Sequence, residues 1–141
     1  MVAAGHAVRV STRTEAGREA IEAAGAECWL GTPNRLATLR SALDSVTILC
    51  WLLGSAVGAA QELSELHTDR LRFFLTQAID TTVRGFVYEA RGTPQELLLE
   101  GREIARELAE RNAIPTRFLN MDPNDGEAWL LDASASIESL L

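Results

Sequence analysis

Short apolar runs alternate with amphipathic stretches along the whole chain. The apolar runs predict five strands, at residues 7–11, 26–30, 46–53, 83–88 and 115–121. Between them, apolar positions three and four residues apart predict helices. Because each predicted strand is followed by a helix, the pattern indicates an α/β fold. We expect a three-layer, doubly wound parallel sheet of about five strands with right-handed crossovers.

Several polar residues stand where helices are expected to begin. Thr93 and Glu96 flank a proline, which predicts an N-cap, a first helical residue and a capping glutamate. Thr12 and Glu15 have the spacing of a capping box, and Asp125 is placed to cap the last helix. The predicted helices cover residues 14–24, 34–43, 60–79, 94–111 and 126–140.

The composition is that of one globular domain covering residues 1–141, with 47% hydrophobic and 23% charged residues. All 13 basic residues are arginine. The lack of lysine excludes mechanisms that depend on a lysine, such as Schiff-base formation. The net charge of −7, without a basic stripe, argues against a nucleic-acid partner.

Neither a metal site nor a membrane segment is expected. Cys28 and Cys50 lie within apolar runs and predict reduced, buried thiols. His6 falls in a turn and His67 on the polar side of its helix, without a second ligand at metal spacing. The uncharged stretch 45–61 is interrupted by glycines and predicts a buried strand followed by a turn. No signal peptide is evident, so a cytoplasmic protein is expected.

Four segments, taken in order, carry a family resemblance. Residues 4–13 read Ala-Gly-His-Ala-Val-Arg-Val-Ser-Thr-Arg, and residues 84–88 read Arg-Gly-Phe-Val-Tyr. Together with residues 23–32 and 35–43, they resemble NAD(P)-binding Rossmann-fold proteins of the atypical and extended short-chain dehydrogenase/reductase superfamily, which includes the NAD-dependent epimerase/dehydratases. That family opens with a strand and a glycine-rich turn, which this chain lacks. The resemblance therefore implies a truncated dinucleotide-binding domain.

The resemblance also implies where a cofactor would bind. In similar proteins an arginine placed like Arg13 contacts the 2′-phosphate of NADP, so NADP is favoured over NAD, and Thr12 would add a hydroxyl. Leu53 and Gly54 would pack against adenine and ribose. The alternatives are a solvated surface arginine, a helix-capping threonine and a buried strand ending in a glycine turn. Parallel sheets bind ligands at the carboxyl ends of their strands, so the loops at Arg91 and Asp122 are further candidates.

The family's catalytic Tyr-x-x-x-Lys is missing, and the one tyrosine, Tyr88, lies on a predicted strand. Packing is therefore a better explanation of Tyr88 than proton transfer, and no catalytic residue is assigned. The leading hypothesis is an NAD(P)-binding protein resembling oxidoreductases and epimerases. The alternative is a non-enzymatic nucleotide sensor or scaffold with a decayed or truncated dinucleotide site. A dinucleotide is the expected partner, and a homo-oligomer is left open.

In the family order, the missing strand lies between the strands at 7–11 and 46–53. Its absence would leave a gap of roughly 9.6 Å. Three outcomes are open: direct pairing of the two strands, filling of the gap by another chain, or poor folding. Direct pairing is favoured because it gives the largest number of backbone N–H and C=O groups a hydrogen-bond partner. It also predicts weak NADPH binding, because the turn that would bind the pyrophosphate is missing.

Overall fold

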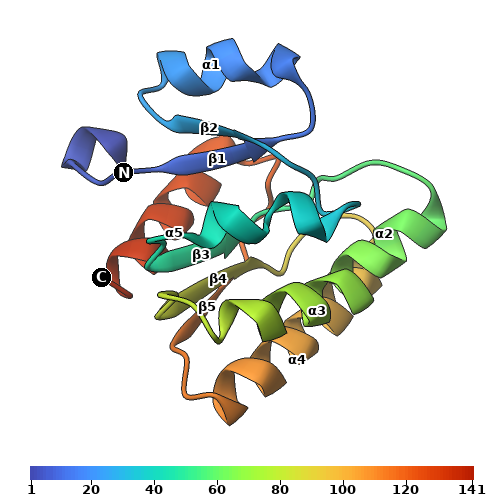
Figure 1. The fold of residues 1–141 in the computed structure, drawn as a ribbon. Helices are drawn as coiled ribbons and strands as arrows, with labels where there is room; N and C mark the ends of the chain where they lie inside the picture. Colours follow the sequence, from blue (N-terminus) through green and yellow to red (C-terminus); the bar gives the residue numbers. More distant parts are fainter. The chain divides into compact units, whose positions relative to one another are not determined.

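The computed structural model describes residues 1–141. The chain divides into two compact units, the N-terminal unit Met1–Asp44 and the C-terminal unit Ser45–Leu141. Figure 1 shows the elements of both, coloured along the sequence. No helix is long and apolar enough to cross a bilayer.

The N-terminal unit is built on two parallel strands, β1 (Arg9–Thr12) and β2 (Glu27–Leu30). After a first 3-10 turn, η1 (Val2–Ala4), β1 is followed by η2 (Glu15–Gly17) and α1 (Arg18–Ala23). Arg9 joins the two strands, because its Nε donates to Glu27 at 2.9 Å. A second guanidinium nitrogen donates to the Ala42 carbonyl at 2.7 Å, which fixes the chain after β2.

Two local predictions for this unit are wrong. The expected helix at 34–43 is a pair of 3-10 turns, η3 (Leu36–Thr38) and η4 (Arg40–Leu43). The Thr38 hydroxyl donates to the Arg35 carbonyl at 2.6 Å and so competes with helical backbone bonding. The capping box is also absent, because the Thr12 hydroxyl donates to the Thr14 carbonyl and Glu15 pairs with Arg18.

The C-terminal unit holds a three-stranded parallel sheet in the order β3-β4-β5. Its strands are β3 (Ile48–Trp51), β4 (Gly85–Glu89) and β5 (Thr116–Leu119). Its helices are α2 (Ala60–His67), α3 (Asp69–Ala78), α4 (Gln95–Arg111) and α5 (Gly126–Glu138). The single helix expected at 60–79 is interrupted at Thr68, whose φ of −123° and ψ of −94° are not helical.

Alternating side chains of β4 divide this unit into three layers. Val87 packs with Leu119 and Ala133 beneath α5. Phe86 and Tyr88 point to the opposite face, which α2, α3 and α4 cover (Figure 1). Every residue of β4 is buried, as expected for a strand that is covered on both faces. This arrangement confirms the predicted layers and the parallel α/β fold class.

The five strands form two sheets, and all of their ladders are parallel. The favoured direct pairing of residues 7–11 with residues 46–53 is therefore wrong. Each sheet pairs its strands through its own helical crossovers, so neither needs the other to form a ladder.

The sequence predicts side-chain caps at the starts of α4 and α5, and the structure has one of the two. Asp125 caps α5, because its carboxylate accepts from the Ala128 N–H at 3.3 Å. The predicted cap of α4 is wrong, since no side chain caps it and its first residue is Gln95. The Thr93 N–H donates to the Gly54 carbonyl at 3.1 Å, which ties this threonine to the end of β3.

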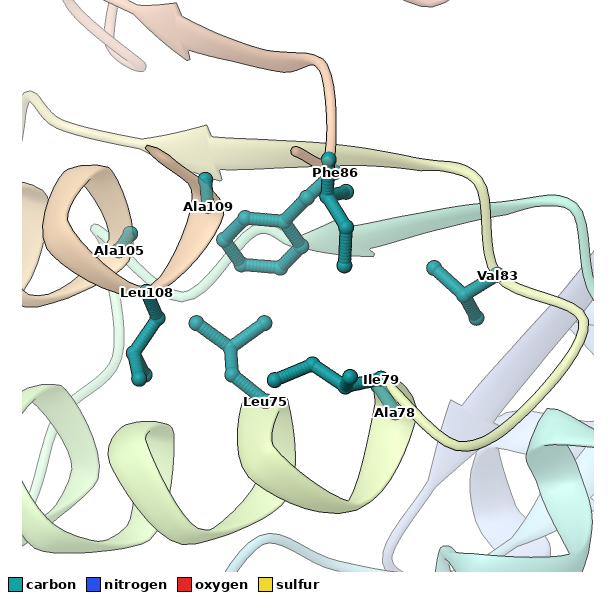
Figure 2. Close-up of a pocket in the computed structure, with 9 residues that line it drawn as sticks. Leu75, Ala78, Ile79, Val83, Phe86, Ala105, Leu108 and Ala109 are labelled. Atoms are coloured by element: carbon teal, nitrogen blue, oxygen red, sulfur yellow. The ribbon is translucent and has the colours of Figure 1, made fainter. Parts of the chain in front are cut away.

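A small apolar cavity of about 20 Å³ lies between α3, α4 and the start of β4. Figure 2 shows Leu75 of α3 and Ile79, which follows α3, facing Phe86, with Leu108 and Val83 beside them. A space this small and apolar is a packing defect rather than a binding site, because a water molecule there would find no polar partner.

Candidate functional site

The loops that follow β3, β4 and β5 surround a second, open cavity of about 750 Å³. Its lining includes Gly54 and Ser55 after β3, Arg91 and Thr93 after β4, and Asp122 after β5. All of these residues lie at the carboxyl ends of parallel strands, which is where open α/β sheets bind ligands. The expected placement of Gly54, Arg91 and Asp122 in loops at the carboxyl ends of strands is confirmed.

Gly54 forms the tightest part of this cavity wall. It is buried, and its N–H donates to the Glu89 carboxylate. A Cβ at Gly54 would collide with the Arg91 carbonyl and with Glu89, and one at Gly92 would collide with the backbone of Gly54. Two glycines are therefore required for the loops after β3 and β4 to approach each other.

Glu89, the last residue of β4, is 3% exposed and has hydrogen bonds on both carboxylate oxygens. One oxygen accepts from Gly54 and the other accepts from Nε1 of Trp129 on α5 at 2.7 Å. This buried carboxylate connects the end of β3 to the helix on the other side of the sheet. The sequence contains one clue to it, an acidic residue at the end of an otherwise apolar strand.

His67 and Tyr88 form a buried pair that the sequence analysis missed. The Tyr88 hydroxyl lies 2.9 Å from Nδ1 of His67, and the two side chains are almost completely buried. The prediction that His67 lies on the polar side of its helix is wrong. Burial lowers the pKa of His67 to about 4, and a hydrogen bond from its ring to the Leu53 carbonyl opposes that shift.

Tyr88 is a packed core residue, as its position on an apolar strand indicates. Burial raises the pKa of its hydroxyl, and the nearby charge of Glu89 raises it further. A Cβ added at Gly101 on α4 would collide with this hydroxyl, which shows how closely the helix packs there. Tyr88 is therefore closed off from any molecule in the cavity.

The other predicted site residues are placed as follows. Arg13 follows β1 directly, is exposed, and forms neither a hydrogen bond nor an ion pair. Thr12 is half-buried and uses its hydroxyl within its own loop. These two belong to the N-terminal unit. In the C-terminal unit, Leu53 is half-buried and Gly54 lines the cavity, so the structure joins Gly54 to Arg91 and Asp122.

The chain offers no group of three or more side chains arranged to hold a metal ion. Cys28 and Cys50 are free, half-buried thiols. Burial raises the pKa of Cys50 to about 11, so its thiol is protonated at neutral pH. The Cys50 thiol is therefore a poor nucleophile.

No family model matches the chain, and no curated protein matches it in sequence. Solved structures do match. Triphenylmethane reductase from Citrobacter sp., complexed with NADP(H), has a TM-score of 0.60 and 19% identity over 79% of this chain. A second structure of that reductase has a TM-score of 0.59 and 18% identity over 79% of this chain, and gox2253 has 0.63 and 20% over 84%. The chain has their Rossmann-like fold.

The matched region covers 38% of the reductase in each of its two structures and 44% of gox2253. The chain thus spans less than half the length of these proteins. The match confirms the fold that the resemblance to atypical short-chain dehydrogenases implied. At 18–20% identity, it establishes the fold alone.

Proposed function

We propose that this chain is an NAD(P)-binding oxidoreductase of the atypical short-chain dehydrogenase type, with NADP as its preferred cofactor. The observation that carries this proposal is the cavity at the carboxyl ends of β3, β4 and β5. It lies in a fold shared with a reductase that was solved with NADP(H). Residues 1–141 would act as one dinucleotide-binding domain.

The residues of the chain fit part of the cofactor. Arg13 is exposed and unpaired, and its planar guanidinium suits the 2′-phosphate that distinguishes NADP from NAD. Thr12 precedes it in the sequence of the N-terminal unit. Within the C-terminal unit, Leu53 and Gly54 are the residues proposed to pack against adenine and ribose. The sequence has no G-x-G-x-x-G turn for the pyrophosphate. When bound, the cofactor would supply hydride from C4 of its nicotinamide.

The test is a titration of this chain with NADPH and with NADH, in which the fluorescence of the cofactor measures binding. We expect saturable binding with a preference for NADPH. Arg13→Glu should weaken NADPH binding at least tenfold and leave NADH binding within about twofold, because only NADPH carries the 2′-phosphate. Arg40→Glu is the matched control, since Arg40 is another exposed arginine of the same unit.

One result would reject the proposal, and a second would reject its assignment of Arg13. The first is no saturable binding of either cofactor. The second is equal weakening of both cofactors by Arg13→Glu, which would remove the assignment of the 2′-phosphate to Arg13.

A nucleotide-sensing module without turnover is the second candidate. It is favoured by two observations: Tyr88 is fully buried against His67, and the chain has no lysine to pair with a tyrosine. Incubating the chain with NADPH and a panel of carbonyl compounds separates the candidates. Oxidation of NADPH supports the oxidoreductase, whereas binding without oxidation supports the sensor.

A further inference from the structure

Some polar side chains in the cavity wall are already engaged in shaping it. Gln95 accepts from the Gly92 N–H at 3.2 Å and donates to the Ala90 carbonyl at 3.0 Å. Asn124 donates to the Asp122 carboxylate through its backbone at 2.8 Å and through its side chain at 2.9 Å. These bonds hold the loops after β4 and β5 in place.

Three other polar side chains of the same wall have no hydrogen-bond partner. The guanidinium of Arg91 and the hydroxyls of Ser55 and Thr93 are exposed and form no hydrogen bond within the chain. Arg91 is the single cationic residue of the lining. The cavity therefore presents hydrogen-bond donors from two loops, one of them charged, which is what an oxyanion requires.

The charges around Arg91 limit how negative a ligand can be. Hydrogen bonds from Asn124 and the charge of Arg91 hold the pKa of Asp122 below its usual range, so Asp122 is ionised at neutral pH. The two side chains do not form an ion pair, which leaves the fork of Arg91 open. The Glu89 carboxylate lies behind Gly54, and that of Glu62 lies close to Gly58. One negative charge on a ligand suits this setting better than two.

We propose that the cavity binds a small molecule carrying one carboxylate, with Arg91 as its anchor and the hydroxyls of Ser55 and Thr93 as additional donors. This proposal rests on the proposed oxidoreductase function for its substrate class, a carbonyl compound with a single carboxylate. The binding step itself depends only on the cavity of the C-terminal unit.

The test uses the full chain and small-molecule probes, and changes in amide chemical shifts in NMR measure binding. Pyruvate is the carboxylate probe, acetone is its neutral counterpart, and inorganic phosphate is the more highly charged anion. We expect saturable shifts with pyruvate at the loops after β3 and β4, weaker binding of phosphate, and no saturable binding of acetone. Arg91→Gln should weaken pyruvate binding at least tenfold, because it removes a charge-assisted hydrogen bond.

Arg111→Gln is the matched control. Arg111 ends α4, whose first turn borders the cavity, so it lies about 24 Å away along the helix. This variant should bind pyruvate within about twofold of the unchanged chain, because the lost charge is beyond the screening length at physiological salt.

Several results would overturn the carboxylate site: no binding of pyruvate, equal binding of acetone, tighter binding of phosphate, or unchanged binding by Arg91→Gln. The outcome is independent of the cofactor titration. Binding of NADPH without pyruvate would reject this proposal and keep the proposed function. Binding of pyruvate without either dinucleotide would keep the carboxylate site and reject the oxidoreductase.

Discussion

Tyr88 of β4 and His67 of α2 are joined by a hydrogen bond of 2.9 Å in the interior of the C-terminal unit. The ring of His67 also bonds to the Leu53 carbonyl, just past the end of β3. One helix thus connects two neighbouring strands through a single side chain. Because Leu53 precedes the glycine in the cavity wall, this core contact also fixes the position of the site.

Removing the tyrosine hydroxyl should destabilise the fold. In Tyr88→Phe, the ring of His67 keeps its burial but loses its partner, at a cost of about 1–3 kcal/mol. Urea unfolding measures the change in free energy. Thr76→Ala is the control, because it removes an exposed hydroxyl that bonds within its own helix. A Tyr88→Phe variant as stable as the control would show that the buried bond contributes nothing.

The free energy of unfolding should decrease as the pH is lowered, over a range set by His67. Its pKa is about 4 in the folded chain and about 6.5 when unfolded. Between these values the unfolded state binds the proton and the folded state does not. The contribution of neutral His67 to the free energy of unfolding is therefore fully present above pH 6.5. It declines as the pH falls toward 4, by up to roughly 3 kcal/mol.

Unfolding free energies at several pH values test this dependence. The decline should flatten in His67→Gln. It should persist in His6→Gln, because His6 is exposed and is the other histidine of the chain. An unchanged pH dependence in His67→Gln would assign the decline to other groups.

Two glycines on helices of the C-terminal unit should respond in opposite ways to alanine. At Gly101 the new methyl group would collide with the Tyr88 hydroxyl and the His67 carbonyl, and overpacking costs about 1–3 kcal/mol. At Gly126 the same methyl group would enter open space, where the better helix propensity of alanine leaves stability unchanged or slightly higher. Thermal unfolding compares the two. Equal melting temperatures would mean that the contact at Gly101 relaxes freely.

The apolar cavity beside Val83 should accept one more methyl group. Val83→Ile fills part of its 20 Å³ and should stabilise the chain by about 0.5 kcal/mol. Val87→Ile is the contrast, since Val87 is fully buried in the packed layer beneath α5 and has no such space. Chemical denaturation should rank the first variant above the unchanged chain and the second below it.

The sequence predicts the parts of this fold that depend on pattern alone. The parallel pairing of the strands and the meeting of Gly54, Arg91 and Asp122 follow from the alternation of apolar runs and helices. The break at Thr68 does not follow, because the apolar face continues on both sides of it. The 3-10 turns around Thr38 were missed because one hydroxyl, and not the hydrophobic pattern, decides the local bonding.

The candidate site could be predicted only as far as its loops. Gly54 and Arg91 each follow a parallel strand in the sequence, and this alone places them at one edge of the sheet, independently of their side-chain contacts. The engagement of Glu89 by Trp129 depends on a contact between residues 40 positions apart, which periodicity does not show. The burial of His67 likewise depends on Tyr88 supplying a partner that a helical pattern does not show.

The two units differ in the size of their apolar cores, and this difference determines which backbone amides exchange their hydrogens with solvent first. Apart from Leu39 and Leu43, every buried apolar side chain lies in the C-terminal unit. The N-terminal unit has one two-stranded ladder and a six-residue helix, and such elements open at low free-energy cost. In deuterium exchange, amides of β1 and β2 should lose protection well before those of β4. Arg13 therefore lies on the part of the protein that opens first, and a ligand held there should slow that exchange.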